Sequence, residues 1–222
     1  MDTKTNKKLK KQLKKKNKKI KELEELIGEI MNLIEAEEEE ETVEDIETKL
    51  FQNRIIYLHD EISQDSLSQI SPLIDYYNLQ DEGIPYQQRK PITIKIGTYG
   101  GEAYEAIGII DSIEASLTPV HVHIEGKSMS AGFYIWASAH TRSMGQRSVA
   151  MYHQARGQIG GTLTDMQRTF TEWQRLQRNL DNLVIENLGV SQEFLDNINQ
   201  QNIDWYVDYN EALSLGMLTD VD

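Results

Sequence analysis

The sequence contains no cysteine among its 222 residues. Disulfide bridges, cysteine nucleophiles and thiolate metal sites are therefore excluded, and this composition suits a reducing compartment such as the cytoplasm. Long apolar runs are missing too, since no stretch approaches the ~20 residues that a membrane-spanning helix needs. The lysine-rich N-terminus lacks the apolar core and cleavage site of a secretory signal. We therefore expect a cytoplasmic protein without a membrane partner.

Positive charge is also scarce. The formal net charge is −13 at pH 7, which argues against a general nucleic-acid binder. The charge is unevenly placed, because the first twenty residues are strongly basic and the run "EAEEEEETVEDIE" is acidic. These blocks set residues 1–47 apart, and we expect a charged extension that is helical or partly disordered. Residues 48–222 should form the globular domain.

Five apolar residues between the two charge blocks follow helical spacing. Steps of three and four predict one apolar face, but two heptads are too short to establish a coiled coil. A solvated polar tail, a self-associating helix, and contact of the basic block with nucleic acid or an acidic partner all stay open. The five residues are Ile20, Leu23, Ile27, Ile30 and Ile34.

Strand-like and helix-like segments alternate through the rest of the chain. Runs that predict strands lie at 54–58, 92–96, 119–126 and 148–154. Segments with helical spacing lie at 63–79, 102–116 and 165–188. Such alternation is typical of βαβ crossovers, so we predict an α/β fold with a mainly parallel sheet covered by helices.

The segment "GTYGG" places two glycines where a strand ends and a helix begins. Glycine permits positive φ and close backbone approach, so N–H groups there can line a nest for a phosphate or an oxyanion. The Walker and dinucleotide-binding glycine patterns are both absent. Taken alone, the segment is explained more simply as a tight turn.

Ser130 lies at another strand-to-helix junction, in "GKSMSAGF". A nucleophilic serine needs an exposed Oγ, a neighbouring base, and amide donors where negative charge develops. The start of a helix supplies the first of these and part of the third. The hydrolase pattern GxSxG is not met, because Ser128 stands in place of its first glycine. The alternative role of Ser130 is a helix cap.

Histidines and carboxylates could complete this chemistry. His153 ends a predicted strand and can accept a serine proton. Asp204 precedes two aromatic residues that could shield a carboxylate–imidazole pair, with Asp208 as its nearest competitor. His121 and His123 share a strand face, but further metal ligands are lacking nearby, so we expect no metal. Spacing alone does not select Asp204.

The order of these segments resembles the proteolytic subunit of the Clp protease, a serine peptidase family. The similarity covers about residues 50–222 and rests on five separated motifs: "NRIIYLHDEIS", "TYGG", "SMSAG", "MYHQ" and "NEALSLGMLTD". By this resemblance the fold is the spiral of repeated βαβ units that Clp subunits share with crotonase-like enzymes. It would carry a projecting strand–helix handle.

The resemblance assigns a role to each candidate residue. It implies Ser130 as nucleophile, His153 as base, and Asp204 as the group that orients the base. The backbone N–H groups of Gly101 and Ala131 would form the oxyanion hole. The implied activity is that of a serine endopeptidase, which acts on polypeptides through an acyl-enzyme and uses no cofactor.

An assembly is implied as well. Family members form stacked rings, so we expect a homo-oligomer of two heptameric rings with active sites facing a chamber. The segment "ARGQIGGTLTDMQ" and the helix after it, with Leu176, Leu180 and Leu183, could project and pair with a second ring. An AAA+ unfoldase is a further candidate partner, although the charged extension replaces the family's short axial loops.

Departures from the family pattern keep alternatives open. Thr98 and Tyr99 replace the usual Ser-Pro, and Ala131 replaces a frequent methionine. Small divergent members also occur in phage genomes, and a phage origin would place the protein in the host cytoplasm. The alternatives are an inactive shell or scaffold subunit, a crotonase-like acyl-CoA enzyme, and a serine–lysine peptidase that uses Lys127.

Overall fold

The computed structural model describes residues 3–37 and 42–219. The chain divides into two units, Met1–Thr48 and Lys49–Asp222. Helix α2 (Val43–Gln52) spans the point of division. Within the described residues, no helix is both long enough and apolar enough to cross a membrane.

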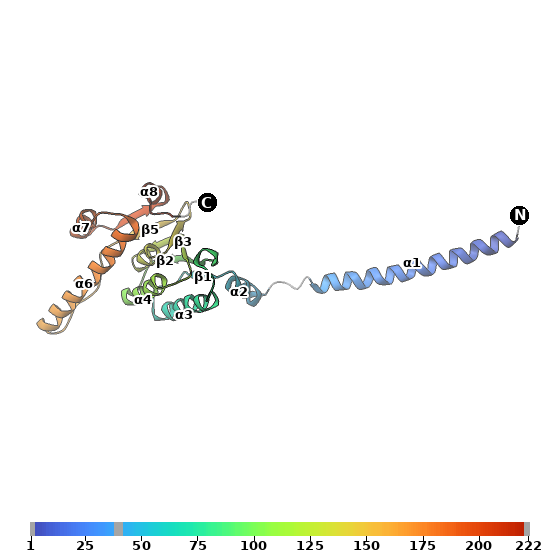
Figure 1. The fold of residues 1–222 in the computed structure, drawn as a ribbon, viewed down its shortest axis with the longest axis horizontal. Coiled ribbons are helices and arrows are strands. Elements are labelled where there is room, and N and C mark those ends of the chain that lie inside the picture. The colour runs from blue at the N-terminus through green and yellow to red at the C-terminus, as the bar shows by residue number, and fades with distance from the viewer. Residues whose placement is uncertain (1–2, 38–41, 220–222) are drawn as a thin grey trace. The chain divides into compact units, whose positions relative to one another are not determined.

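The N-terminal unit is dominated by α1 (Thr3–Glu37), one uninterrupted helix (Figure 1). The predicted apolar row lies on this helix, and Ile20, Leu23, Ile27 and Ile30 are each about half exposed. The side chain of Ile34 lies outside the described residues, as does part of the predicted acidic block. The pairing of this row with another helix stays a prediction.

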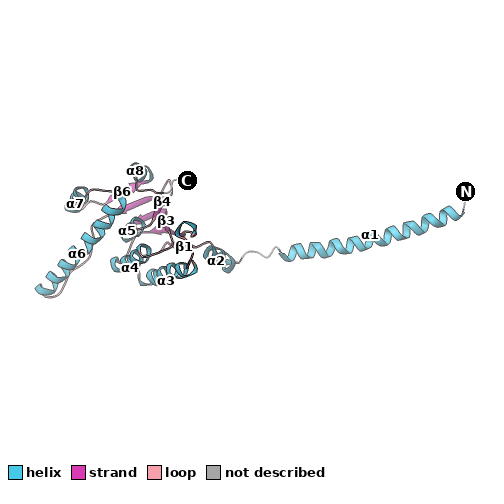
Figure 2. Cartoon of the chain, viewed as in Figure 1, coloured by secondary structure: helices cyan, strands magenta, loops and turns pink. Residues whose placement is uncertain are grey.

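A mixed sheet organises the larger unit (Figure 2). Within the described residues, six strands form it in the order β1-β2-β3-β5-β6, with β4 beside β3. Neighbouring strands run parallel except β6, which runs antiparallel to β5. The α/β fold with a mainly parallel sheet is therefore confirmed. The strands are β1 (Ile55–Leu58), β2 (Ile92–Thr98), β3 (Val120–Met129), β4 (Thr141–Met144), β5 (Val149–Tyr152) and β6 (Trp205–Asp208).

Helices bury one face of this sheet. Alternate residues of β2 and β3 are fully buried in the same apolar core as residues of α3, α4 and α5. The residues between them, which include Lys95 and His123, are polar and half-buried. This alternation is typical of a sheet packed on one side. The helices are α3 (Gln64–Gln80), η1 (Tyr86–Gln88), α4 (Ala103–Glu114), α5 (Ala131–Ala137), α6 (Leu163–Leu188), α7 (Gln192–Gln201) and α8 (Tyr209–Ser214).

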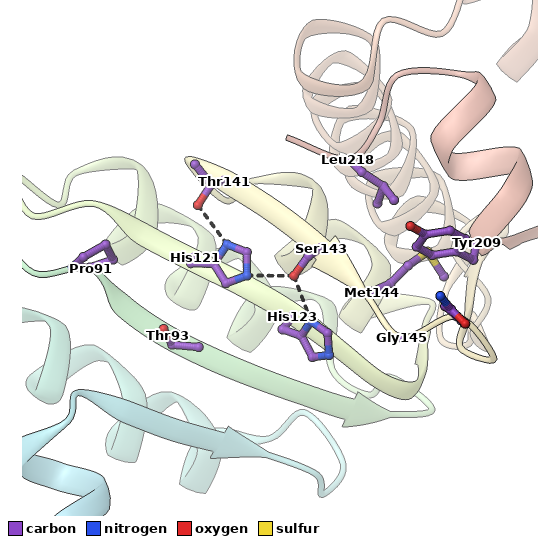
Figure 3. Close-up of a pocket in the computed structure, with 11 residues that line it drawn as sticks. Pro91, Thr93, His121, His123, Thr141, Ser143, Met144, Gly145, Tyr209 and Leu218 are labelled. Atoms are coloured by element: carbon purple, nitrogen blue, oxygen red, sulfur yellow. Dashed lines mark hydrogen bonds between the residues drawn. The ribbon is translucent and has the colours of Figure 1, made fainter. Parts of the chain in front are cut away.

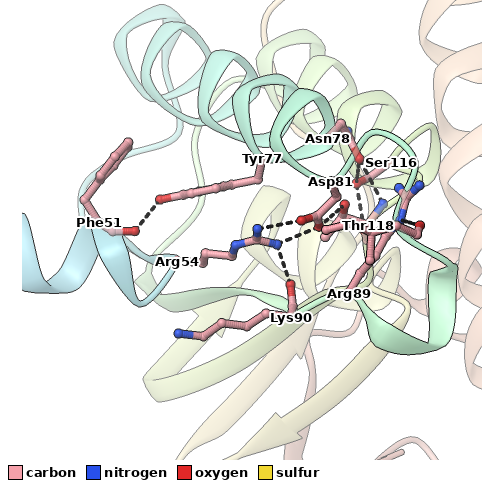
Figure 4. Close-up of polar contacts among 10 residues, drawn as sticks. Phe51, Arg54, Tyr77, Asn78, Asp81, Arg89, Lys90, Ser116 and Thr118 are labelled. Carbon is pink, nitrogen blue, oxygen red and sulfur yellow. Dashed lines mark hydrogen bonds and ion pairs between the residues drawn. The ribbon is translucent and has the colours of Figure 1, made fainter.

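A buried ion pair ties the start of β1 to the end of α3 (Figure 4). Arg54 donates to both carboxylate oxygens of Asp81, each at 2.7 Å. The two side chains are 11% and 3% exposed, and the Arg54 hydrogen bonds hold the pKa of Asp81 below its usual value. Thr118 donates to the same carboxylate at 2.8 Å. Three chain segments therefore meet at one charge pair.

Replacing Arg54 should destabilise the protein more than replacing a surface arginine. Arg54→Leu leaves the Asp81 carboxylate buried without its partner, which typically costs about 3 kcal/mol or more in free energy of unfolding. Urea denaturation measures this change. The control Arg178→Leu alters an exposed arginine and should leave the midpoint unchanged. Equal midpoints for the two variants would contradict the structural role of the pair.

Candidate active site

Ser130 occupies the junction between β3 and α5 in an unusual backbone conformation. Its φ is 54° and its ψ is −121°, a region that non-glycine residues rarely adopt. Its N–H donates to the Met151 carbonyl at 2.8 Å, which extends the β3–β5 pairing by one residue. Strained backbone of this kind gathers at functional sites, where the surrounding structure holds it in place. The side chain makes no capping hydrogen bond to α5.

The glycine pair at 100–101 lies directly against this junction. A Cβ on Gly100 would come 2.7 Å from the Cβ of Ser130, and one on Gly101 would come 2.2 Å from the Ile62 carbonyl oxygen. Ile62 pairs with Gly101 in a parallel bridge, whose hydrogen bonds use the carbonyl of Gly100 and the N–H of Glu102. The N–H of Gly101 therefore points away from Ile62.

A cavity of about 360 Å³ brings four of the predicted residues together. Ser130, His153, Gly101 and Ala131 all line it. Ala131 is the first residue of α5, so its N–H lacks a partner within the helix. Most of the remaining wall is apolar, formed by Ala103, Ala106, Tyr134, Trp173, Leu176 and Leu180. The cavity thus combines a hydroxyl, an imidazole and two backbone N–H groups within a partly apolar wall that also includes Glu102 and Arg156.

His153 directly follows β5 and is half-buried. Burial, together with the positive charge of Arg156, holds the pKa of His153 below 6.5. The imidazole is therefore neutral, and able to accept a proton, at neutral pH. Its Nδ1 atom is buried and has no hydrogen-bond partner. The Asp204 carboxylate, the acceptor that the Clp resemblance implies for this nitrogen, therefore does not bind it.

Asp204 lies just beyond the strand pair that leads to His153. The antiparallel pairing of β5 and β6 ends with Tyr152 opposite Trp205, so His153 and Asp204 each lie one residue outside the paired strands. The Asp204 carboxylate, however, is paired with the guanidinium of Arg156. Within the described residues, no hydrogen bond joins Ser130 to His153 or His153 to Asp204. Asp204 therefore lies near His153, but its carboxylate binds Arg156 instead.

Comparison with known proteins agrees with this geometry. A family model described as "Clp protease" matches residues 37–222, which is most of the chain. The chain belongs to the Clp protease family.

Individual relatives carry names from the same Clp family. The chain is 27% identical over 180 residues to "ATP-dependent Clp protease proteolytic subunit 2" of Synechococcus sp. (strain CC9605), a match that covers 80% of this chain and 87% of the relative. It is 26% identical over 180 residues to "ATP-dependent Clp protease proteolytic subunit" of Bacteroides fragilis (strain ATCC 25285), covering 80% of this chain and 83% of the relative. Identity at this level supports a Clp-type peptidase.

Lys127 and Asp208, the alternatives to His153 and Asp204, make other contacts in this Clp family member. The Lys127 amine lies 4.3 Å from the centre of the Tyr99 ring, a cation–π contact, and Lys127 does not line the cavity around Ser130. This position weighs against a serine–lysine pair. Asp208 caps α8, because its side chain accepts from the Glu211 N–H at 2.9 Å. Asp208 is therefore a helix cap, and its carboxylate is occupied away from His153.

The two strand histidines lie at a separate site, on the face of β3 opposite its buried valines (Figure 3). Ser143 bridges them, with its Oγ 2.7 Å from His121 Nε2 and 2.8 Å from His123 Nδ1. The other ring nitrogen of His121 lies 2.9 Å from the Thr141 hydroxyl. Among the described residues, no group of three or more His, Cys, Asp or Glu side chains could hold a metal ion. Serine and threonine partners thus account for the positions of these rings.

The segment between β5 and α6 differs from the expected strand of the handle. Residues 153–160 form neither helix nor strand. The Ala155 N–H donates to the side chain of Gln177 at 2.7 Å. A Cβ on Gly157 would come 2.2 Å from the Trp173 ring. This segment therefore packs along α6 instead of pairing with a strand. It contains Arg156, which no motif in the sequence marks as functional.

The leucines of α6 face inward. Leu176 and Leu180 are 4% and 5% exposed and line the cavity, so the expectation that they pair with a second ring is wrong. Leu183 packs, partly buried, against the same core. Leu163 and Phe170, nearer the start of the helix, are exposed instead. Helical spacing identifies an apolar face but does not tell a core contact from a contact between subunits.

Adding a methyl group at Gly101 should disrupt the site. Gly101→Ala combines a positive φ with a clash against Ile62, and we expect it to lower the free energy of unfolding by about 3 kcal/mol. The matched control Gly126→Ala also has a positive φ but meets no atom within 4 Å, and should cost about 1 kcal/mol. Chemical denaturation compares them. Equal losses would show that Gly101 is not held against Ile62.

Proposed function

We propose that the protein is a serine endopeptidase in which Ser130 attacks the peptide carbonyl and His153 accepts its proton. The observation that carries the proposal is the shared cavity, which both side chains line together with the backbone at Gly101 and Ala131. Membership of the Clp protease family supports the same reaction class.

The first half of the reaction transfers an acyl group to the enzyme. As the Ser130 oxygen bonds to the carbonyl carbon, its proton passes to the neutral imidazole of His153. The carbonyl oxygen becomes an oxyanion and accepts hydrogen bonds from the N–H groups of Gly101 and Ala131. The imidazolium then donates its proton to the leaving amine, and the acyl-enzyme remains.

The second half reverses these roles with water as the nucleophile. His153 takes a proton from water as the water oxygen attacks the ester carbon. The imidazolium then donates this proton to the Ser130 oxygen, and the carboxylic acid product leaves. The apolar wall of the cavity strengthens electrostatic stabilisation of both oxyanions by lowering the local dielectric constant.

Asp204 has the role of orienting the base. A carboxylate that accepts from Nδ1–H selects the tautomer whose Nε2 faces the serine, and it stabilises the imidazolium. The pairing of β5 and β6 supports this role, because it ends one residue short of both His153 and Asp204. The reaction therefore requires Asp204 to reach Nδ1, which has no hydrogen-bond partner in the structure.

The assembly follows from the proposed function. Relatives are named as proteolytic subunits of ATP-dependent proteases, and we assign this chain the same kind of partner, an AAA+ unfoldase that feeds a chamber of stacked heptameric rings. Leu163 and Phe170 on α6 are 83% and 49% exposed, so this helix offers an apolar contact between rings. Residues 1–47 form a separate charged extension in this scheme.

A second candidate function is an inactive assembly subunit of the same fold. The unpartnered Nδ1 of His153 and the engagement of Asp204 with Arg156 favour it. Intact rings that hydrolyse no peptide and take up no fluorophosphonate, a reagent that labels activated serines, would establish this alternative.

Removing the Ser130 hydroxyl should abolish hydrolysis. Ser130→Ala is expected to reduce turnover of a fluorogenic peptide by on the order of 10⁶, because no other group supplies the nucleophile. The control Ser138→Ala removes a hydroxyl at the other end of α5 and should retain turnover. Light scattering verifies that both variants keep the native assembly. Undiminished turnover by Ser130→Ala would refute the assignment.

Light scattering should report a mass many times the 25.6 kDa of one chain at micromolar concentration. Phe170→Glu is expected to halve this mass, because a buried charge without a partner disfavours the contact between rings. The control Gln167→Glu places the same charge on an exposed position of α6 and should keep the full mass. A monomeric wild-type protein would contradict the chamber.

A further inference from the structure

Arg156 contacts both the cavity around Ser130 and the carboxylate of Asp204. It lines the cavity that Ser130 and His153 share, and its guanidinium donates to the Asp204 carboxylate. Its side chain is 54% exposed, and that of Asp204 is 30% exposed. It belongs to the segment 153–160, which forms neither helix nor strand. Breaking the ion pair between Arg156 and Asp204 therefore requires no change in the strands of the sheet.

His153 and Arg156 compete for the same carboxylate. His153 follows the last residue of β5 and Asp204 precedes the first residue of β6, whose pairing ends with Tyr152 opposite Trp205, and the charge of Asp204 acts on the imidazole. Yet His153 Nδ1 is buried without a partner, while the cation three residues later holds the acid. The guanidinium of Arg156 carries a permanent positive charge, so it attracts the carboxylate by charge as well as by hydrogen bonding, whereas a neutral imidazole N–H offers the hydrogen bond alone.

We propose that Arg156 is a positioning residue that withholds Asp204 from His153, so that the triad assembles only when the guanidinium moves away. The inference rests on the proposed function of Ser130 and His153. When Arg156 leaves, Asp204 accepts from Nδ1–H of the facing imidazole. In that arrangement the carboxylate stabilises the imidazolium, which the cation of Arg156 otherwise disfavours.

The charges around His153 determine in which direction its pKa should change when Arg156 is replaced. Arg156 lowers the pKa of His153 and Asp204 raises it, with burial as the largest effect. Removing the cation and freeing the carboxylate both raise this pKa. Since the neutral imidazole is the active form, the acidic limb of the rate profile moves to higher pH. The other titratable groups that line the cavity are Glu102, Tyr104 and Tyr134.

The experiment compares Arg156→Leu with the wild-type full-length chain. Two readouts are followed against pH: kcat/KM for a small fluorogenic peptide, and the rate at which a fluorophosphonate labels Ser130. We expect Arg156→Leu to raise both about tenfold at neutral pH and to move the acidic limb up by about one pH unit. If the rate rose only because the segment around Arg156 had become disordered, the acidic limb of the pH–rate profile would stay at the same pH.

Three variants isolate the mechanism. Arg156→Lys keeps a cation beside Asp204 and should retain the low rate. Arg178→Leu removes an exposed arginine elsewhere on the chain and should match the wild type. In an Asp204→Asn background, Arg156→Leu should give no gain, because the two effects run through one carboxylate.

Two results would overturn the inference. One is a fall in both rates for folded Arg156→Leu, which would mean that Arg156 supports the triad. The other is a gain that persists in the Asp204→Asn background. Failure of the proposed function itself looks different: a Ser130→Ala protein that hydrolyses peptide as well as the wild type removes the nucleophile assignment in every Arg156 variant.

Discussion

The hydrogen bond from the Ser130 N–H to the Met151 carbonyl is the contact on which the site depends. It continues the parallel pairing of β3 with β5 and holds Ser130 at positive φ. His153 lies two residues beyond Met151, so the same pairing sets the distance between hydroxyl and imidazole. Gly100 completes the junction, because only a residue without a side chain can lie so close to Ser130.

A second strand pairing, between β5 and the antiparallel β6, brings the Asp204 carboxylate toward the site. The antiparallel strand β6 brings Asp204 beside His153, at the edge where β5 ends. Behind β5, the Tyr152 hydroxyl donates to the buried Asp181 carboxylate at 2.6 Å, which fixes α6 against the strand. Burial raises the pKa of Asp181. The helix that walls the cavity is therefore fixed to the strand that leads into His153.

Local patterns in the sequence account for much of this fold. The apolar runs predicted β1, β2, β3 and β5, whereas the parallel strand β4 was not predicted, because its sequence TRSM is largely polar. The antiparallel β6 was not predicted, because its partner lies more than fifty residues earlier in the chain. The pairing of Arg156 with Asp204, 48 residues apart, is equally invisible to spacing. Ser130 stood out as a junction residue, but its joint role with His153 came from family resemblance.

The central claim is that Ser130 and His153 act as one nucleophile–base couple. Mass spectrometry of the assembled protein after fluorophosphonate treatment tests it most directly. The account predicts a single adduct on Ser130 in the wild type and its loss in a folded His153→Ala variant, since the hydroxyl then has no proton acceptor. Labelling of Ser130 that proceeds equally well without the imidazole, or an adduct on a different serine, would contradict the account.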